Sequence, residues 1–378
     1  MRFSSTIFII ASMVASLLSS CSGGRAVRLS EALSRDSIEY ATGFSISRHA
    51  QFTEVNVLDP WDSTRLLQRY LLIDRNLKAL PEGMGEGTVV RIPIENLALY
   101  TSVHASIVEL LHQEDRVAGL CEVRYIDSKI LKRRVEEGTV SDLGEATAPN
   151  IEKIMDLECE AIISSPFKDA GYGPAEKLGI PIIEGADYME NHPLGRVEWI
   201  KFYGMLLGAE ELADSIYINT CREYNALKEL TADVAHRPTM ISERRYGGQW
   251  FVPGGKSYNA VMYADAGADY IFKYTAESGS TPLAFESVLD RGIHADIWIF
   301  KYYNDKDMTY SDLKAEYEPY ANFDAFKSRN IFVCNSSKRA YYEDAPMHPH
   351  LILKDYIYIF HPELLPEYQP LYFERLSE

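Results

Sequence analysis

The stretch from Ala209 to Leu230 limits the possible folds of this chain more than any other feature. It contains neither Gly nor Pro over about 22 residues, which at about 1.5 Å per residue makes a helix roughly 33 Å long. A stripe of bulky side chains runs along it and can pack on two separate bodies while the opposite face stays polar. The stripe consists of Leu212, Ile216, Thr220, Tyr224 and Leu227. We predict a helix over residues 209–232 that connects two domains; the alternative is a peripheral helix of one large domain.

Short β-branched runs alternate with amphipathic stretches on both sides of this helix. Strands that alternate with helices at this spacing form parallel sheets. The chain has 378 residues, 46% of them hydrophobic, which exceeds what one core usually serves. The predicted fold is α/β, with two Rossmann-like lobes of mainly parallel strands, one long interdomain helix and a ligand cleft between the lobes. The strands are expected at 89–94, 116–123, 161–167, 180–186, 239–246, 269–274, 296–300 and 330–335.

The N-terminus is typical of an exported protein. Arg2 precedes an apolar run from Ile7 to Leu18, which is shorter than the about 20 residues that a membrane-spanning helix needs. Leu18 to Cys21 resembles the lipobox of bacterial lipoproteins, in which the cysteine is lipidated after cleavage. We predict a lipoprotein signal peptide over 1–20, a lipid anchor at Cys21, and a location in the periplasm or cell envelope. An ordinary signal peptide with an incidental cysteine is the alternative.

The segment before the first predicted parallel strand has its own strands. "GFSISRHAQFTEVNVLD" and "RYLLIDRN" indicate strands that extend the first sheet in antiparallel fashion. The predicted domains are therefore an N-terminal lobe over 21–208 with this extension, the connecting helix over 209–232, and a C-terminal lobe over 233–378.

The two halves resemble each other in one helical segment. Glu152, Asp156 and Ala161 correspond to Glu286, Asp290 and Ala295 at a constant offset of 134 residues. The similarity can reflect any helix that feeds a parallel strand, with Glu in its first turn because it suits the helix dipole. The functional interpretation is that each lobe displays one carboxylate at an equivalent place.

Aromatic side chains and arginines crowd the ends of the predicted strands. Ligands of open parallel sheets lie beyond the carboxyl ends of the strands. That rule selects Glu95 and Asn96, Arg124 and Tyr125, Phe167, 244–251, 301–303 and 335–348. With 25 tyrosines in the chain, rim or core positions are the alternative for each aromatic residue. The predicted ligand contacts are Tyr125, Arg244 (or Arg245), Tyr246, Trp250, Phe251, Tyr302 and Tyr342, with His348 either at the side of the ligand or in a solvated loop.

Charge and motif content exclude several classes of protein. The net charge of −17 becomes −17 − 1 = −18 after loss of Arg2, which argues against nucleic acid as a partner. There is no HExxH, GxSxG or dense His/Asp cluster, so we predict no catalytic residues, no protein metal site and no cofactor. Cys121, Cys159 and Cys334 sit in apolar runs, which favours buried free thiols for the cysteines after Cys21; the alternative is that the exported chain pairs them in disulfides.

From about Glu39 to its C-terminus the chain resembles the substrate-binding proteins of ABC importers for ferric siderophores, haem and cobalamin. The resemblance rests on four segments in this order: "GEATAPNIEKIMDLECEAIISSPF", "PLGRVEWIKFYGMLLGAEELAD", "WFVPGGKSYNAVMYADAGADY" and "LILKDYIYIFHPEL". It implies two lobes joined by one helix, a metal chelate or corrinoid in the cleft, and no enzymatic activity. It also implies that Glu152 and Glu286 dock on a permease dimer that works with an ATPase. A binding lipoprotein that serves a surface receptor and an exported hydrolase with a dispersed site are the alternatives.

Overall fold

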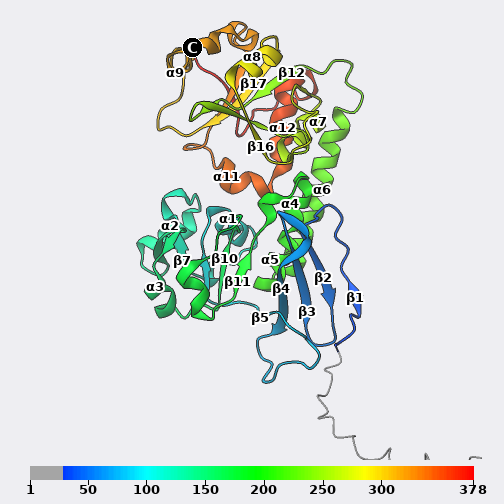
Figure 1. The fold of residues 1–378 in the computed structure, drawn as a ribbon, viewed down its shortest axis with the longest axis vertical. Coiled ribbons are helices and arrows are strands. Elements are labelled where there is room, and N and C mark those ends of the chain that lie inside the picture. The colour runs from blue at the N-terminus through cyan, green and yellow to red at the C-terminus, as the bar shows by residue number, and fades with distance from the viewer. Residues whose placement is uncertain (1–28) are drawn as a thin grey trace, which may run out of the picture.

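Helix α6 (Glu210–Leu230) joins two α/β lobes in the computed structural model, which describes residues 29–378 (Figure 1). It follows α5 (Ile200–Leu207), which ends at Gly208 in the left-handed conformation that glycine adopts readily, with φ of 71°. The predicted connecting helix and fold class are confirmed. The predicted signal peptide and the lipidation of Cys21 lie outside the described residues.

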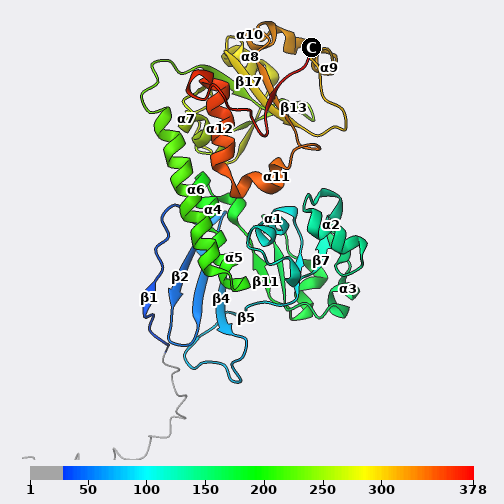
Figure 2. The same cartoon turned by 180° about the vertical axis from the view of Figure 1, so that it is seen from behind.

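The two halves of α6 belong to different hydrophobic cores. Ala213 and Tyr217 pack in the N-terminal core, whereas Tyr224 packs in the C-terminal core. Cys221 lies between them and touches both clusters. Seen from behind, α6 packs against α5 in one lobe and α12 (Pro349–Phe360) in the other (Figure 2). The predicted stripe is therefore the face that holds the two lobes together.

The N-terminal lobe is built on a six-stranded sheet in the order β11-β10-β6-β7-β8-β9. All neighbouring pairs are parallel except β8 with β9, and Ala161 of β10 lies opposite Leu97 of β6. Strands β6 and β10 are buried along their whole length, as parallel strands covered on both faces are. The strands are β6 (Leu97–Leu99), β7 (Val117–Cys121), β8 (Ser141–Glu145), β9 (Ala148–Pro149), β10 (Ala161–Ser164) and β11 (Ile182–Glu184). The helices are α1 (Ser102–Leu110), α2 (Lys129–Glu136), α3 (Ile151–Asp156) and α4 (Pro193–Glu198).

The C-terminal lobe repeats this plan with a sheet in the order β15-β12-β17-β18-β19, in which only β19 is antiparallel. A second sheet, β13-β14-β16, covers part of it. The strands are β12 (Thr239–Ser242), β13 (Arg245–Tyr246), β14 (Gln249–Pro253), β15 (Asp269–Tyr270), β16 (Ser280–Leu283), β17 (Ile297–Tyr302), β18 (Ile331–Asn335) and β19 (Glu374–Arg375). The remaining helices are α7 (Tyr258–Asp265), α8 (Phe285–Gly292), α9 (Tyr310–Glu316), α10 (Asp324–Lys327) and α11 (Tyr341–Asp344).

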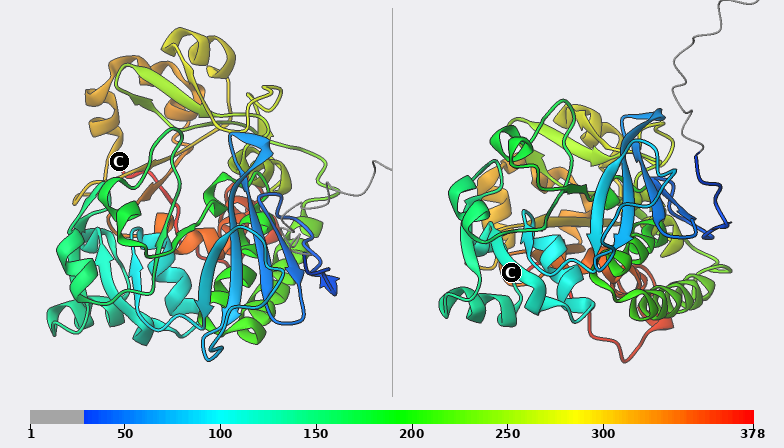
Figure 3. Two further views of the ribbon diagram at one scale, coloured as in Figure 1. Left: turned by 60° about the horizontal axis from the view of Figure 1, so that its bottom comes forward. Right: turned by 90° about the horizontal axis from the view of Figure 1, so that it is seen from below.

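A separate five-stranded sheet stands beside the N-terminal lobe (Figure 3). One face of this sheet joins the same core as α5, for example through the contact of Tyr70 with Phe202, and the opposite face has a small cluster of its own around Leu71 and Ile73. The prediction that these strands extend the first parallel sheet is wrong, because they bury their own face against the helices. The strands are β1 (Ser34–Arg35), β2 (Phe44–Arg48), β3 (Thr53–Asp59), β4 (Asp62–Asp74) and β5 (Thr88–Ile92).

Two buried carboxylates fix the segment that connects β1 to β2 of this sheet. Glu198 accepts hydrogen bonds from the backbone N–H groups of residues 39–41 at 2.8–3.0 Å. Glu190 accepts from the N–H groups of Thr42 and Gly43 at 2.8–3.0 Å. Since a carboxylate that receives several N–H groups makes strong, charge-assisted bonds, the sheet is tied firmly to α4 and its flanking turn.

Four cysteines lie within residues 29–378, and none of them forms a disulfide. Cys121, Cys159, Cys221 and Cys334 are free, and all but Cys221 are buried, as predicted for the three in apolar runs. Within residues 29–378, no helix combines the length and the apolar character needed to cross a membrane.

Candidate ligand-binding site

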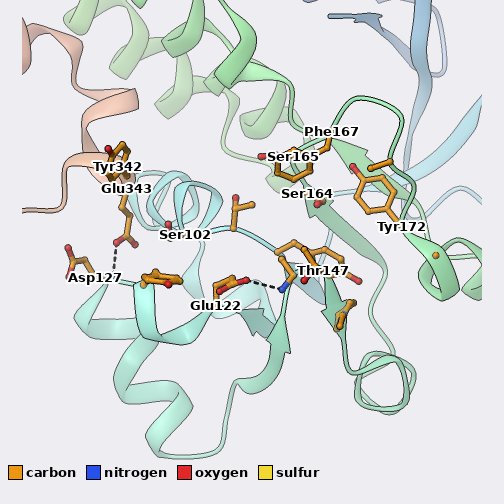
Figure 4. A pocket seen from close by; sticks show the side chains of 18 of the residues that line it. Ser102, Glu122, Asp127, Thr147, Ser164, Ser165, Phe167, Tyr172, Tyr342 and Glu343 are labelled. Atoms are coloured by element: carbon orange, nitrogen blue, oxygen red, sulfur yellow. Dashed lines mark hydrogen bonds between the residues drawn. The ribbon is translucent and has the colours of Figure 1, made fainter. Parts of the chain in front are cut away.

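A cavity of about 1110 Å³ lies between the two lobes, and both contribute to its wall (Figure 4). The N-terminal lobe lines it with the segments that follow β6, β7, β8 and β10, and the C-terminal lobe with those that follow β17 and β18. Carboxyl ends of parallel strands are where open α/β sheets bind ligands. Six tyrosines line the cavity: Tyr100, Tyr125, Tyr172, Tyr303, Tyr341 and Tyr342.

The end of β6 forms one part of the N-terminal wall. Thr101 precedes α1 as its N-cap residue, and its hydroxyl lies 2.8 Å from Nδ1 of His104. His104 is buried and its Nε2 is 3.2 Å from the hydroxyl of Tyr203, which donates to Asp187 at 3.0 Å. This network orients Thr101 at the start of the helix, beside Ser102 in the cavity wall.

The prediction of Glu95 and Asn96 at this edge is wrong. The strand predicted over 89–94 is β5 of the separate sheet, and the first strand of the parallel sheet is the short β6. The cavity residues after it, among them Ser102, were missed for that reason. The available signal was the apolar run "LALY" followed by Thr101, a residue type that commonly caps helices.

Glu122 follows β7 with a left-handed backbone, φ of 56°, which is uncommon for a non-glycine residue. Its N–H donates to the carbonyl of Gly144 at 2.8 Å, and its Oε1 accepts from the N–H of Ala146 at 3.1 Å. These bonds connect the ends of β7 and β8 and leave the side chain in the wall of the cavity (Figure 4). The backbone conformation therefore directs a carboxylate toward the ligand space.

Tyr125 comes next, in the short 3-10 helix after β7. Its ring is stacked under the guanidinium of Arg124 at 4.7 Å and meets the ring of Tyr303 edge-on, with the centroids 6.5 Å apart. Tyr303 belongs to the C-terminal lobe. Aromatic side chains of the two lobes thus meet at the rim of the cavity.

Helix α11 carries the C-terminal contribution. Tyr342 is exposed in the cavity, and Glu343 beside it is buried at 5% relative accessibility. Oε2 of Glu343 accepts from the backbone N–H of Asp127 in the other lobe at 2.6 Å, whereas Oε1 has no hydrogen-bond partner. Burial raises the pKa of Glu343 to about 8. This residue is a direct polar contact between the lobes.

The structure brings only two of the eight predicted ligand contacts to the cavity, Tyr125 and Tyr342. Trp250 is 0% exposed and its Nε1 donates to the carbonyl of Ser242 at 2.9 Å. Tyr302 is buried and its hydroxyl accepts from the N–H of Met308 at 2.9 Å. The placement of these two residues in the cleft is corrected, since both serve the C-terminal core.

The other four predicted contacts lie elsewhere. Arg244 forms an ion pair with Glu316, and the alternative Arg245 stacks on Tyr317 at 3.9 Å. Tyr246 (81% exposed) and Phe251 (37% exposed) lie on the β13–β14 hairpin, outside the cavity wall. His348 pairs with Asp344 at 2.8 Å and does not line the cavity. The hairpin, with its ion pairs, occupies the end of β12 that the strand-end rule had assigned to the ligand.

Glu152 and Glu286 occupy equivalent positions in the two lobes. Each is exposed in the first turn of its helix, α3 or α8. Each helix leads into the strand that pairs with the first strand of its parallel sheet, β10 with β6 and β17 with β12. The offset found in the sequence therefore corresponds to the same topological place, and the role of the pair in docking remains a prediction.

No group of three or more His, Cys, Asp or Glu side chains in residues 29–378 is arranged to hold a metal ion. The cavity wall offers instead hydroxyl groups, aromatic faces and four charged or ionisable side chains. These are Glu122, Asp127, Glu343 and Arg339.

Comparisons with known proteins agree with this architecture. Two uncharacterized lipoproteins of Methanocaldococcus jannaschii are 27% and 24% identical, over 73% and 78% of this chain and 67% and 76% of their own lengths. A possible iron-binding (periplasmic solute-binding) protein of Staphylococcus epidermidis superposes with a TM-score of 0.57 at 15% identity, covering 71% of this chain and 98% of the other. A haem-complexed protein of S. aureus gives 0.54 at 14% identity, covering 70% and 98%.

The match to a family model covers most of the two lobes. Residues 97–337 match the model described as "Periplasmic binding protein", and the match begins at β6 and so leaves out the separate sheet. Together with the two lobes, the connecting helix and the cavity at the strand ends, this match shows that the chain belongs to the periplasmic binding protein family.

Proposed function

We propose that this protein is a lipid-anchored substrate-binding protein of an ABC importer. It captures an iron complex (a ferric siderophore or haem) or cobalamin in the interlobe cavity and delivers it to a permease dimer with its ATPase. Lipidation of Cys21 would hold it at the membrane, within reach of the permease. The main support for this function is the cavity, which lies at the strand ends of both parallel sheets and is lined by six tyrosines.

The size and lining of the cavity support a large, rigid, partly apolar ligand. Its volume of about 1110 Å³ lies just above the usual range of ligand pockets, roughly 300–1,000 Å³. Aromatic faces such as those of Tyr125, Tyr342 and Phe167 can cover a chelate or macrocycle, and hydroxyl groups can meet its polar rim. The proteins of similar structure include a possible iron-binding protein, a periplasmic haem-binding protein and a protein complexed with haem, which supports the same ligand class.

Docking would use the equivalent helices of the two lobes. Glu152 and Glu286 are exposed and lie at matching topological positions. A permease dimer has two-fold symmetry, so two carboxylates at equivalent places suit paired cationic groups on it.

The test is a ligand screen on purified protein without its signal peptide. Haem, cyanocobalamin and a set of ferric siderophores are each added, and thermal unfolding and the absorbance spectrum are recorded. A ligand at about 100 times its Kd should stabilise the folded state by about 2.7 kcal/mol, which gives a clear shift in Tm. A shift with one chelate class supports the proposal, and no shift with any of them overturns it.

A further inference from the structure

We infer that the cavity selects neutral or cationic chelates whose rim carries N–H donors, and that Glu122 and Asp127 are the residues that exclude polyanionic ones. This inference rests on the proposed function and narrows its ligand class. It follows from the balance of charged groups in the cavity wall.

Both carboxylates line the cavity, and each has one cation within 4 Å, on an exposed side chain that is not part of the lining. Glu122 lies 3.7 Å from Arg124, but that arginine is closer to Glu145, at 3.0 Å. Asp127 forms an ion pair with Lys132 at 3.8 Å, and an ion pair between two exposed side chains contributes little. In Figure 4 the side chains of Glu122 and Asp127 lie along the same side of the cavity.

The cation of the wall is already engaged. Arg339 donates to the carbonyl of Leu371 at 2.8 Å and lies 3.6 Å from Glu374. The arginines expected to receive an anionic ligand pair with Glu316 (Arg244) or stack on Tyr317 (Arg245), outside the cavity. Among the described residues that line the cavity, no cation is left free to compensate a ligand with several negative charges.

Glu343 adds a third carboxyl group to the wall. Its carboxyl group is buried, lines the cavity, and leaves Oε1 without a partner. Burial raises the pKa of Glu343 to about 8, so at neutral pH the negative charge of the wall comes from the two other carboxylates.

The N-terminus of α1 acts in the opposite sense, because it favours a negatively charged ligand, but its partial charge is smaller than the charge of the two carboxylates. Helix α1 begins at the cavity, and no side chain caps its first N–H groups. A helix N-terminus carries roughly half an elementary charge, against two full charges on Glu122 and Asp127. Its N–H groups suit a neutral acceptor such as an amide or hydroxamate oxygen.

The experiment compares ferric chelates of similar size and different charge. The probes are a ferric trihydroxamate with one free ammonium group, and a trianionic ferric tris-catecholate. Affinities are measured by quenching of intrinsic fluorescence at low and moderate salt. We expect the cationic chelate to bind at least about tenfold more tightly, since opposing like charges in a partly desolvated site are costly.

Glu122→Gln tests the residue itself. The amide oxygen can still accept from the N–H of Ala146, so the local fold is retained while the charge is lost. We expect a loss of about fivefold in affinity for the cationic chelate and a gain for the trianionic one. Asp127→Asn, on an exposed side chain, should act in the same direction. Glu136→Gln, on the exposed face of α2 and outside the cavity, is the matched control and should change neither affinity.

The outcomes separate the two proposals. Equal or tighter binding of the trianionic chelate, or an unchanged charge preference in both cavity variants, overturns this inference and leaves the proposed function standing. Binding of neither probe, together with no thermal shift for haem or cyanocobalamin, overturns both.

Discussion

Glu122 and Glu243 hold the same kind of position in the two lobes. Each follows a parallel strand directly, each has a positive φ (56° and 62°), and each donates its N–H to a segment of the same lobe's sheet. Their side chains differ in what they meet. Glu243 forms an ion pair with the buried Lys301, whereas Glu122 lines the cavity.

The two lobes also differ in how open the carboxyl ends of their parallel strands are. In the C-terminal lobe the β13–β14 hairpin, the Glu243–Lys301 pair and the Arg244–Glu316 pair close the end of β12. In the N-terminal lobe four strand ends remain open to the cavity. Equivalent backbone geometry thus places one carboxylate in an internal ion pair and the other in the cavity wall, and the polar partners decide which.

The two lobes are alike at Glu152 and Glu286, and the largest expected effect tests that likeness. Glu152→Arg combined with Glu286→Arg should abolish uptake of the bound chelate while ligand affinity is retained, because both docking contacts would turn repulsive. Uptake is measured in cells that lack their own copy of the protein. Asp156→Arg with Asp290→Arg, on the same two helices, is the matched control. Unchanged transport in the first double variant would reject the docking role.

Substitution of Trp250 tests whether the β13–β14 hairpin, which closes the end of β12, is part of the C-terminal core. We expect Trp250→Ala to lower the free energy of unfolding by about 3–5 kcal/mol, since it removes a fully buried ring that packs on Trp298. Phe251→Ala, its more exposed neighbour, should cost less than about 1 kcal/mol. Urea unfolding measures both values. Equal losses would mean that this edge is not part of the core.

Substitutions of Tyr125 and Tyr246 compare the cavity wall of the N-terminal lobe with the hairpin that closes the end of β12. Tyr125→Ala should weaken chelate binding about tenfold, because an aromatic contact contributes about 0.5–1.5 kcal/mol beyond the area that it buries. Tyr246→Ala, on the exposed hairpin, should leave the affinity unchanged. Titration with cyanocobalamin and with the cationic ferric trihydroxamate distinguishes the two. A larger loss for Tyr246→Ala would move the ligand to the C-terminal lobe.

Glu343 of α11 accepts a hydrogen bond from Asp127 of the other lobe, and its substitution is expected to give the smallest of these effects. Burial raises its pKa from 4.5 to about 8, so between these pH values it is neutral in the folded chain and ionised in the unfolded one. Its contribution to stability is therefore present below about pH 4.5 and is lost as the pH rises to about 8. The charged groups that act on it are Asp127, Lys132 and Glu109, with Asp344 next to it on α11.

Comparison of the wild type with Glu343→Gln isolates this contribution. The Tm of the unliganded wild type should fall by a few degrees relative to that of the variant between pH 5 and about pH 8. Parallel curves for the two proteins would contradict the raised pKa.

The architecture could be predicted from the sequence because its signals are strong and local. The absence of Gly and Pro between Ala209 and Leu230 predicts α6, and the apolar runs of β10, β17 and β18 predict parallel strands. The rule that ligands lie beyond strand ends leads to Tyr125 and Tyr342 in the cavity wall. Whether these two tyrosines contact a ligand stays a prediction.

The rest depends on partners that a sequence does not display. In "QWFVP" alternate residues point to opposite faces of β14, but the pattern does not say that Trp250 faces the core and Phe251 faces away. Arg244 reads as an available cation until Glu316, far along the chain, is placed beside it. The run "VVRI" has the stronger strand signal, and it lies in the separate sheet, which hid the short β6.

The division of α6 between two cores has a consequence for how the molecule unfolds. Helices in folded proteins gain most of their stability from tertiary packing, because isolated helices are marginal in water. If the N-terminal core unfolded, the first half of α6 would lose its packing and the helix would fray toward Tyr224. If the C-terminal core unfolded, the second half of α6 would lose its packing and the helix would fray toward Tyr217. Neither lobe can melt without weakening the other. The described chain is therefore expected to behave as one cooperative unit, with a single calorimetric transition in place of two.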